Sequence, residues 1–194
     1  MRKLATLSLA IFALAATSSG LAAKDAPKVS IPDSFIESIR GWAENPVLIE
    51  AIKAQNAKNA NLSQEDIDKQ DKQWRAETKA SAKPMIDAVL GNDASAYLKK
   101  VKADSKGLFT EIFAMDNKGL NVGQSDATSD YWQGDEAKWQ KSYGAGPNGY
   151  LVDEVEFDES TQTYQSQVSV AIVDPATKDV IGAVTVGVNV EMLD

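Results

Sequence analysis

The sequence predicts an α+β fold, in which helices from the first half of the chain pack on a roughly five-stranded antiparallel sheet from the second half. Three observations lead to this prediction. Apolar residues recur at helical spacing over residues 32–104. After that, apolar residues alternate or form short runs of strand length. Short polar turns separate these runs, and tight turns join strands antiparallel.

Proline and capping signals divide the first half into several helices. Phe35, Ile36 and Ile39 begin the first apolar stripe. Proline removes a backbone donor and restricts the residue before it, so it predicts a break wherever it interrupts such a stripe. Ser63 with Asp66 three residues later is similar to a capping box. The predicted boundaries are Asn45-Pro46, Ser63 with Asp66, Lys83-Pro84, and Gly91 with Asn92 or Asp93.

The second half has the alternation of apolar residues and the turn signals that are typical of a sheet. Asp116-Asn117-Lys118-Gly119 is a hairpin turn, because glycine adopts a positive φ at little cost. Residues 126–149 form a long polar and aromatic loop, with one helical turn around 136–141. The predicted strands are 108–115, 120–125, 150–157, 163–173 and 180–190.

The N-terminus has the layout of a secretory signal peptide. Arg2 and Lys3 precede an apolar run that is too short to span a bilayer, and Ala22 and Ala23 are candidate cleavage points. An uncleaved membrane anchor is the alternative. We therefore expect a signal peptide at 1–23, a helical region at 24–106, a sheet core at 107–194, and a periplasmic or secreted product.

Composition excludes several function classes. The chain has no cysteine and no histidine, which removes thiolate or histidine metal sites, cysteine nucleophiles and serine–histidine relays. A formal net charge of −8 does not favour nucleic acid as a partner. No cofactor and no metal site are predicted. Carboxylate catalysis, a hard-cation site and a binding module without chemistry remain.

Two stretches resemble the Cache (PAS-like, PDC) extracytoplasmic sensor domains of bacterial chemoreceptors and sensor kinases. They are the hairpin AMDNKGLNVGQSD (114–126) and the closing hairpin YQSQVSVAIVDPATKDVIGAVTVGVNV (164–190). The resemblance covers roughly residues 35–190. It implies a PAS/Cache-like sheet, an N-terminal helix, and a ligand pocket between the sheet and the loops above it.

The chain departs from the family in two respects. Cache domains usually sit between two membrane helices, whereas no later apolar stretch here could span a membrane, so we expect a free-standing form that signals through a membrane receptor or kinase partner. Amino-acid-binding members use an arginine beside the aromatic residues. The corresponding loop here offers Lys138 and Lys141 instead.

The aromatic loop is the predicted ligand site. Aromatic faces next to carboxylates suit a cationic or amphipathic small ligand. The alternative is that these rings pack on the sheet as core while the acids face water. The residues of the predicted site are Phe113, Asp126, Asp130, Tyr131, Trp132, Trp139, Lys141, Tyr143, Tyr164 and Ser166.

The sequence therefore predicts a sensor-like module that binds an amine, an amino acid or a small organic acid and performs no chemistry. A carboxylate-based hydrolase is one alternative, because acids cluster over residues 153–159. A structural or adhesive exported protein is another. Pairing of the first helix with a second copy would give a homodimer.

Overall fold

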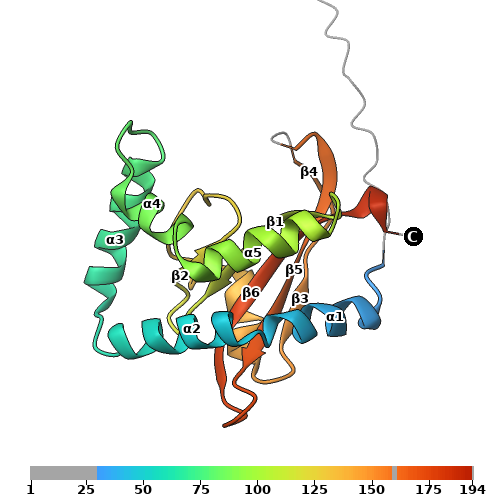
Figure 1. Ribbon diagram of the computed structural model, residues 1–194, viewed down its shortest axis with the longest axis horizontal. Helices are drawn as coiled ribbons and strands as arrows, with labels where there is room; N and C mark the ends of the chain where they lie inside the picture. Colours follow the sequence, from blue (N-terminus) through green and yellow to red (C-terminus); the bar gives the residue numbers. More distant parts are fainter. Residues whose placement is uncertain (1–29, 159–160, 194) are drawn as a thin grey trace, which may run out of the picture.

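Helices cover one face of a six-stranded antiparallel sheet in the computed structural model, which confirms the predicted α+β class (Figure 1). The structure describes residues 30–158 and 161–193. The predicted signal peptide lies outside these residues. Within them, no helix combines the length and apolar character needed to cross a membrane.

The helices begin and end at the signals in the sequence. Asn45 accepts a hydrogen bond from the amide of Val47, and Pro46 is the first residue of the second helix. Ser63 and Asp66 form the predicted capping box. Asn92 caps the fifth helix through the amide of Ser95. The bounds are α1 Asp33–Ala43, α2 Pro46–Lys58, α3 Gln64–Glu77, α4 Pro84–Leu90 and α5 Asp93–Asp104.

The sheet has the strand order β2-β1-β6-β5-β3, and β4 also pairs with β5. All of these pairs are antiparallel. The strands are β1 Phe109–Met115, β2 Asn121–Gln124, β3 Tyr150–Val152, β4 Glu156–Asp158, β5 Thr163–Val173 and β6 Val180–Asn189. Short helices α6 (Ala137–Gln140) and η1 (Tyr143–Ala145) lie between β2 and β3, and η2 (Val190–Met192) follows β6.

The sheet has six strands where roughly five were predicted, because the predicted strand 150–157 is divided into β3 and β4. Val152 pairs with Val168 and Glu156 pairs with Gln165, so four steps along one strand face three along the other. The extra residue interrupts the ladder as a bulge does, and it separates β3 from β4.

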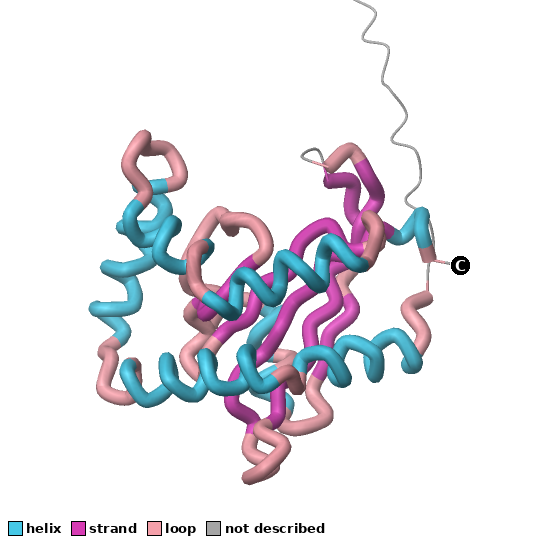
Figure 2. The backbone as a smooth tube through the Cα atoms, in the orientation of Figure 1, coloured by secondary structure: helices cyan, strands magenta, loops and turns pink. Residues whose placement is uncertain are grey.

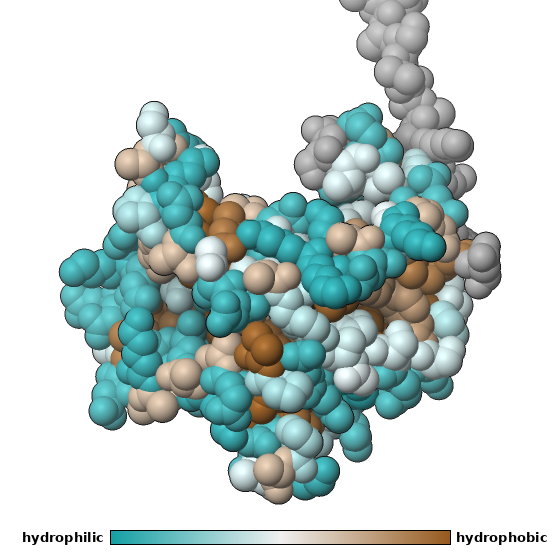
Figure 3. Space-filling model, viewed as in Figure 1, coloured by the Kyte–Doolittle hydropathy of each residue, from teal (hydrophilic) through white to brown (hydrophobic). Residues whose placement is uncertain are grey.

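The two faces of the sheet are covered differently. Helices α1, α2 and α5 pack on one face and bury the main apolar core, with α1 against β5, α2 against β6 and α5 against β1 and β2 (Figure 2). We call this the helix-covered face; seen in Figure 3, its outer surface is mostly hydrophilic, with small apolar patches between the helices. Residues 137–145 of the connection 125–149 pack on the opposite face, which we call the loop-covered face.

Helices α3 and α4 form a second, smaller core beyond the β2 edge of the sheet (Figure 1). Its buried side chains are Ile67, Trp74, Ile86, Leu120 and Tyr131. Leu120 belongs to the β1–β2 hairpin and Tyr131 to the 125–149 connection, so this core joins the α3–α4 pair to the sheet.

Asp116 holds the β1–β2 hairpin together. It is fully buried, and its Oδ1 accepts hydrogen bonds from the amides of Lys118 and Leu120, each at 2.9 Å. Its Oδ2 accepts from Gln55 Nε2 at 3.1 Å and from Asn59 Nδ2 at 2.9 Å. One carboxylate therefore closes the turn and ties it to α2.

Candidate functional site

The structure does not bring the four aromatic residues of the predicted site together. Tyr131 stacks on Trp74 of α3, with 5.4 Å between ring centroids and 26° between ring planes, inside the α3–α4 core. Trp132 packs against the same core and donates from Nε1 to the carbonyl of Lys118 at 2.8 Å. These two rings therefore hold the connection to the α3–α4 pair.

The other two rings cover the loop-covered face of the sheet. Trp139 and Tyr143 stack at 4.8 Å between centroids and pack on Phe113, Met115 and Ala183. Trp139 Nε1 also donates to the Asp116 carbonyl at 3.1 Å. Phe113 thus lies beneath the connection, and these two rings pack on it as core.

The predicted acids form ion pairs outside this aromatic cluster. Asp126 Oδ2 lies 2.6 Å from Lys102 Nζ of α5, and Asp130 Oδ2 lies 3.1 Å from Arg75 Nη2 of α3. Lys141 is exposed after α6. Asp126 and Asp130 therefore tie the connection to two different helices, and neither pairs with Lys141.

Ser166 and Tyr164 belong to the helix-covered side of β5. Ser166 pairs with Val188, which lies in the main core with Val168. Because side chains alternate along a strand, Tyr164 shares the side of Ser166, while Gln165 and Gln167 take the other. Tyr164 and Ser166 therefore lie on the opposite face of the sheet from Phe113 and do not form one pocket floor with it.

A polar cleft lies on the loop-covered face, beside the Trp139–Tyr143 pair. Its volume is about 250 Å³. It is bounded by α6, by β5 and by the segment that joins β3 to β4. Its lining residues are Lys138, Asp153, Glu154, Glu156, Gln165 and Gln167. We call this the acidic cleft.

Side chains of β1 hold the two glutamines of the acidic cleft. Gln167 Nε2 donates to Glu111 Oε1 at 2.9 Å, and Thr110 Oγ1 donates to Gln165 Oε1 at 2.6 Å. Burial raises the pKa of Glu111, while the hydrogen bond from Gln167 and the charge of Lys138 oppose that rise. A titratable carboxyl group therefore lies directly behind the cleft.

The charges of the acidic cleft are mostly negative. Within the described part of the chain, Asp153, Glu154 and Glu156 have no ion-pair partner. Lys138 Nζ lies 2.9 Å from Glu136 Oε2 and 5.5 Å from the centroid of the Phe113 ring. The cleft therefore offers carboxylates to a cation, and a single ammonium group at one side.

These lining residues, and Glu111 behind them, were outside the predicted site, although the sequence carried signals for them. Glu111 interrupts the apolar strand FTEIFAM on the same side as Phe113, and an acid at such a position is unusual in a covered strand. The acids over 153–156 were assigned to solvent. In the described residues, no group of three or more acids is arranged to hold a metal ion.

No family model and no curated protein matches the chain. Among solved structures, it is similar to the ligand-binding domain of the Campylobacter jejuni chemoreceptor Tlp3 in complex with 4-methylisoleucine, at 15% identity and a TM-score of 0.39, covering 81% of this chain and 52% of that one. The sensor domain of the Vibrio cholerae histidine kinase DctB matches at 12% identity and 0.37, covering 81% and 57%.

The ligand-binding domain of the Pseudomonas aeruginosa amino acid chemoreceptor PctC, in complex with GABA, matches at 14% identity and a TM-score of 0.41, covering 80% of this chain and 56% of that one. The chain spans little more than half the length of these matched chains. They are Cache-type sensory domains, the kind of domain that the sequence resembles.

Proposed function

We propose that this protein is an extracytoplasmic sensor-like module that binds a small ligand carrying an ammonium group in the acidic cleft and leaves it chemically unchanged. The observation that carries this proposal is the cleft itself. It gathers unpaired carboxylates on the loop-covered face, with Glu111 behind them. Export rests on the N-terminal sequence, and a membrane receptor or kinase is the proposed partner.

The chemistry of the lining favours an amine or an amino acid. A hydrogen bond to a charged group contributes about 1.5–3 kcal/mol, so two or three carboxylates around one ammonium group support specific binding. Lys138 also lines the cleft, and the carboxylate of an amino acid would share its ammonium group with Glu136. A volume of about 250 Å³ limits the ligand to a small metabolite.

The route from the cleft to the rest of the molecule runs through the 125–149 connection. Lys138 lines the cleft and Trp139, its neighbour in α6, packs on the sheet. Further along, Arg40 of α1 donates to the carbonyls of Pro147, Asn148 and Gly149 at 3.2, 3.0 and 3.4 Å. A ligand that favours one position of the connection thereby biases α1, provided that its affinity differs between the two positions.

Calorimetric titration of the purified protein with diamines, γ-aminobutyrate and the common amino acids tests the proposal. We expect saturable binding of at least one amine or amino acid, with no product formed. Glu156→Gln removes one charge from the cleft and should weaken that binding about tenfold. The matched control is Asp179→Asn, an exposed acid outside the cleft that should bind as the parent does.

The two alternatives give different results in the same experiment. A carboxylate hydrolase would convert a substrate and lose turnover when one acid is replaced. A structural or adhesive protein would bind none of these compounds. Equal affinity of the parent and the Glu156→Gln variant would place the ligand elsewhere and refute the assignment of the cleft.

A further inference from the structure

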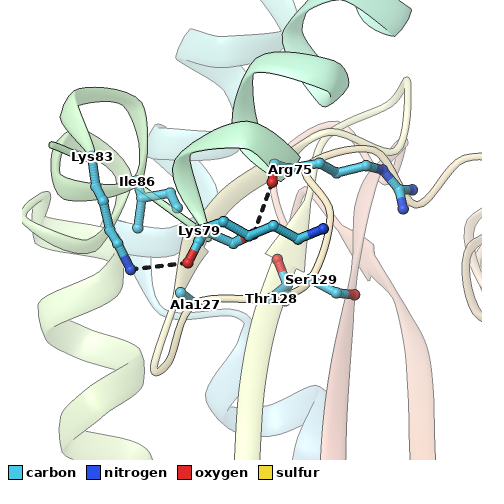
Figure 4. A pocket seen from close by; sticks show the side chains of 8 residues that line it. Arg75, Lys79, Lys83, Ile86, Ala127, Thr128 and Ser129 are labelled. Carbon is cyan, nitrogen blue, oxygen red and sulfur yellow. Dashed lines mark hydrogen bonds between the residues drawn. The ribbon is translucent and has the colours of Figure 1, made fainter. Parts of the chain in front are cut away.

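A second cavity, of opposite charge, lies beside the α3–α4 pair (Figure 4). Its volume is about 590 Å³, and it is formed by the end of α3, the connection from α3 to α4, and residues 127–129. It shares no lining residue with the acidic cleft. The residues that line it are Arg75, Thr78, Lys79, Lys83, Ile86, Ala127, Thr128 and Ser129. We call it the basic cavity.

Three cations line this cavity, although the whole chain has a formal net charge of −8. Within residues 30–158 and 161–193, neither Lys79 nor Lys83 has a carboxylate partner. Lys83 Nζ donates only to the Thr78 carbonyl, at 3.3 Å. Figure 4 shows Lys79 extended across the cavity, with its ammonium group toward Thr128 and Ser129. The lysines therefore supply positive charge that no neighbouring acid neutralises.

Arg75 differs from the two lysines, because its charge is already paired with carboxylates of the protein. Its Nε lies 2.6 Å from Asp71 Oδ2, and its Nη2 lies 3.1 Å from Asp130 Oδ2. Asp71 Oδ1 also accepts hydrogen bonds from the amides of Tyr131 and Trp132. These contacts fix the 127–132 segment against α3, so the wall opposite the lysines is held in place before any ligand binds.

Residues 127–129 add hydrogen-bond donors to this wall. The backbone amides of Ala127 and Ser129 have no hydrogen-bond partner in the described part of the chain. Thr128 is held from both sides, because its Oγ1 accepts from Asn121 Nδ2 at 2.9 Å and donates to the Asp130 carbonyl at 2.6 Å. Free backbone amides on a fixed segment, next to ammonium groups that have no carboxylate partner, are the groups that bind oxygen anions.

We propose that the basic cavity binds a small oxyanion with two or more negative charges, such as a dicarboxylate, a tricarboxylate or a phosphate compound. Lys79 and Lys83 contact its charged groups, and backbone amides of residues 127–129 donate hydrogen bonds to it from the opposite side. A monovalent anion would meet only one of the lysines and bind weakly. The proposal does not depend on the ligand of the acidic cleft, because the two sites have no residue in common.

Calorimetric titration with citrate and with pyrophosphate, at constant ionic strength in chloride, tests this site. We expect saturable one-site binding of at least one of them. Lys79→Gln and Lys83→Gln should each weaken it about tenfold, since each removes a charge-assisted hydrogen bond. Both side chains reach solvent, so thermal melts should show folded variants. Amide resonances of 127–129 should shift on binding.

Lys72→Gln is the matched control, because Lys72 is an exposed lysine of α3 outside the cavity. It makes the same change in net charge and should bind as the parent does. An equal loss in Lys72→Gln would show a general charge effect and overturn the site. So would the absence of saturable binding by both anions, or binding that survives the loss of both cavity lysines.

Discussion

Replacing Asp116 with asparagine should lower the melting temperature of this protein by several degrees. The carboxylate accepts four hydrogen bonds in a fully buried position, two on each oxygen. Asparagine keeps one acceptor oxygen and turns an NH₂ group toward the other pair of donors. Two hydrogen bonds are therefore lost, and buried donors are left facing a donor.

The expected size of the effect follows from these contacts. A hydrogen bond to a charged group contributes about 1.5–3 kcal/mol. Gln55 is only partly buried, and its Nε2 also donates to the carbonyls of Leu120 and Asn121, each at 3.3 Å. These bonds remain in the variant, so losing the bond from Gln55 to the carboxylate costs less than the full amount. We expect a net destabilisation of about 3 kcal/mol. For a chain of this length, that lowers Tm by about 6–12 °C.

Urea unfolding followed by circular dichroism measures this difference. Asp126→Asn is the matched control, since Asp126 forms an exposed ion pair with Lys102 and its loss should cost under about 1 kcal/mol. Asn59→Ala removes one of the donors to this buried carboxylate and should cost about 1.5–3 kcal/mol. If Asp116→Asn were no less stable than Asp126→Asn, the stability of the hairpin would not depend on this carboxylate.

Three further predictions concern β1, α1 and the hairpin turn. Glu111→Gln should be more stable than the parent at pH 7–8 and equal to it near pH 4. The folded-state pKa of Glu111 lies above its unfolded value, so the parent loses stability as pH rises through it; denaturant melts over this range test the sign. Arg40→Gln should speed hydrogen exchange of amides in 125–149 and leave β1 and β6 protected, because it frees the carbonyls of 147–149; unchanged exchange would contradict this. Gly119→Ala should lose about 2 kcal/mol or more in thermal melts, since φ is +82° and a Cβ there would lie 2.5 Å from the backbone of Gly134; a stable variant would exclude this strain.

Local signals in the sequence were sufficient for the helices and most of the sheet. Pro46, the Ser63–Asp66 box and Asn92 act on backbone groups within a few residues, so their effect can be read without the fold. The Asp116–Gly119 turn is equally local. The division between β3 and β4 was missed, because the extra residue shows only when the partner strand is known.

The candidate site depended on contacts far apart in the sequence, and much less of it could be predicted. Tyr131 and Trp139 share one loop, yet Tyr131 stacks on α3 and Trp139 packs on β1. Nothing in their spacing decides which core each ring joins. The sequence also does not decide the register of β5 against its neighbours. A shift of one residue exchanges Ser166 for Gln167 on a given face of the sheet.

In the proposed function, the acidic cleft holds the ammonium group of a small ligand. Titration of the parent, Glu156→Gln and Asp179→Asn with the same amine, followed by calorimetry and by analysis of the recovered compound, tests it most directly. We expect saturable binding that weakens about tenfold in Glu156→Gln alone, with the compound recovered intact. Equal binding by all three proteins, or conversion of the compound, would contradict it.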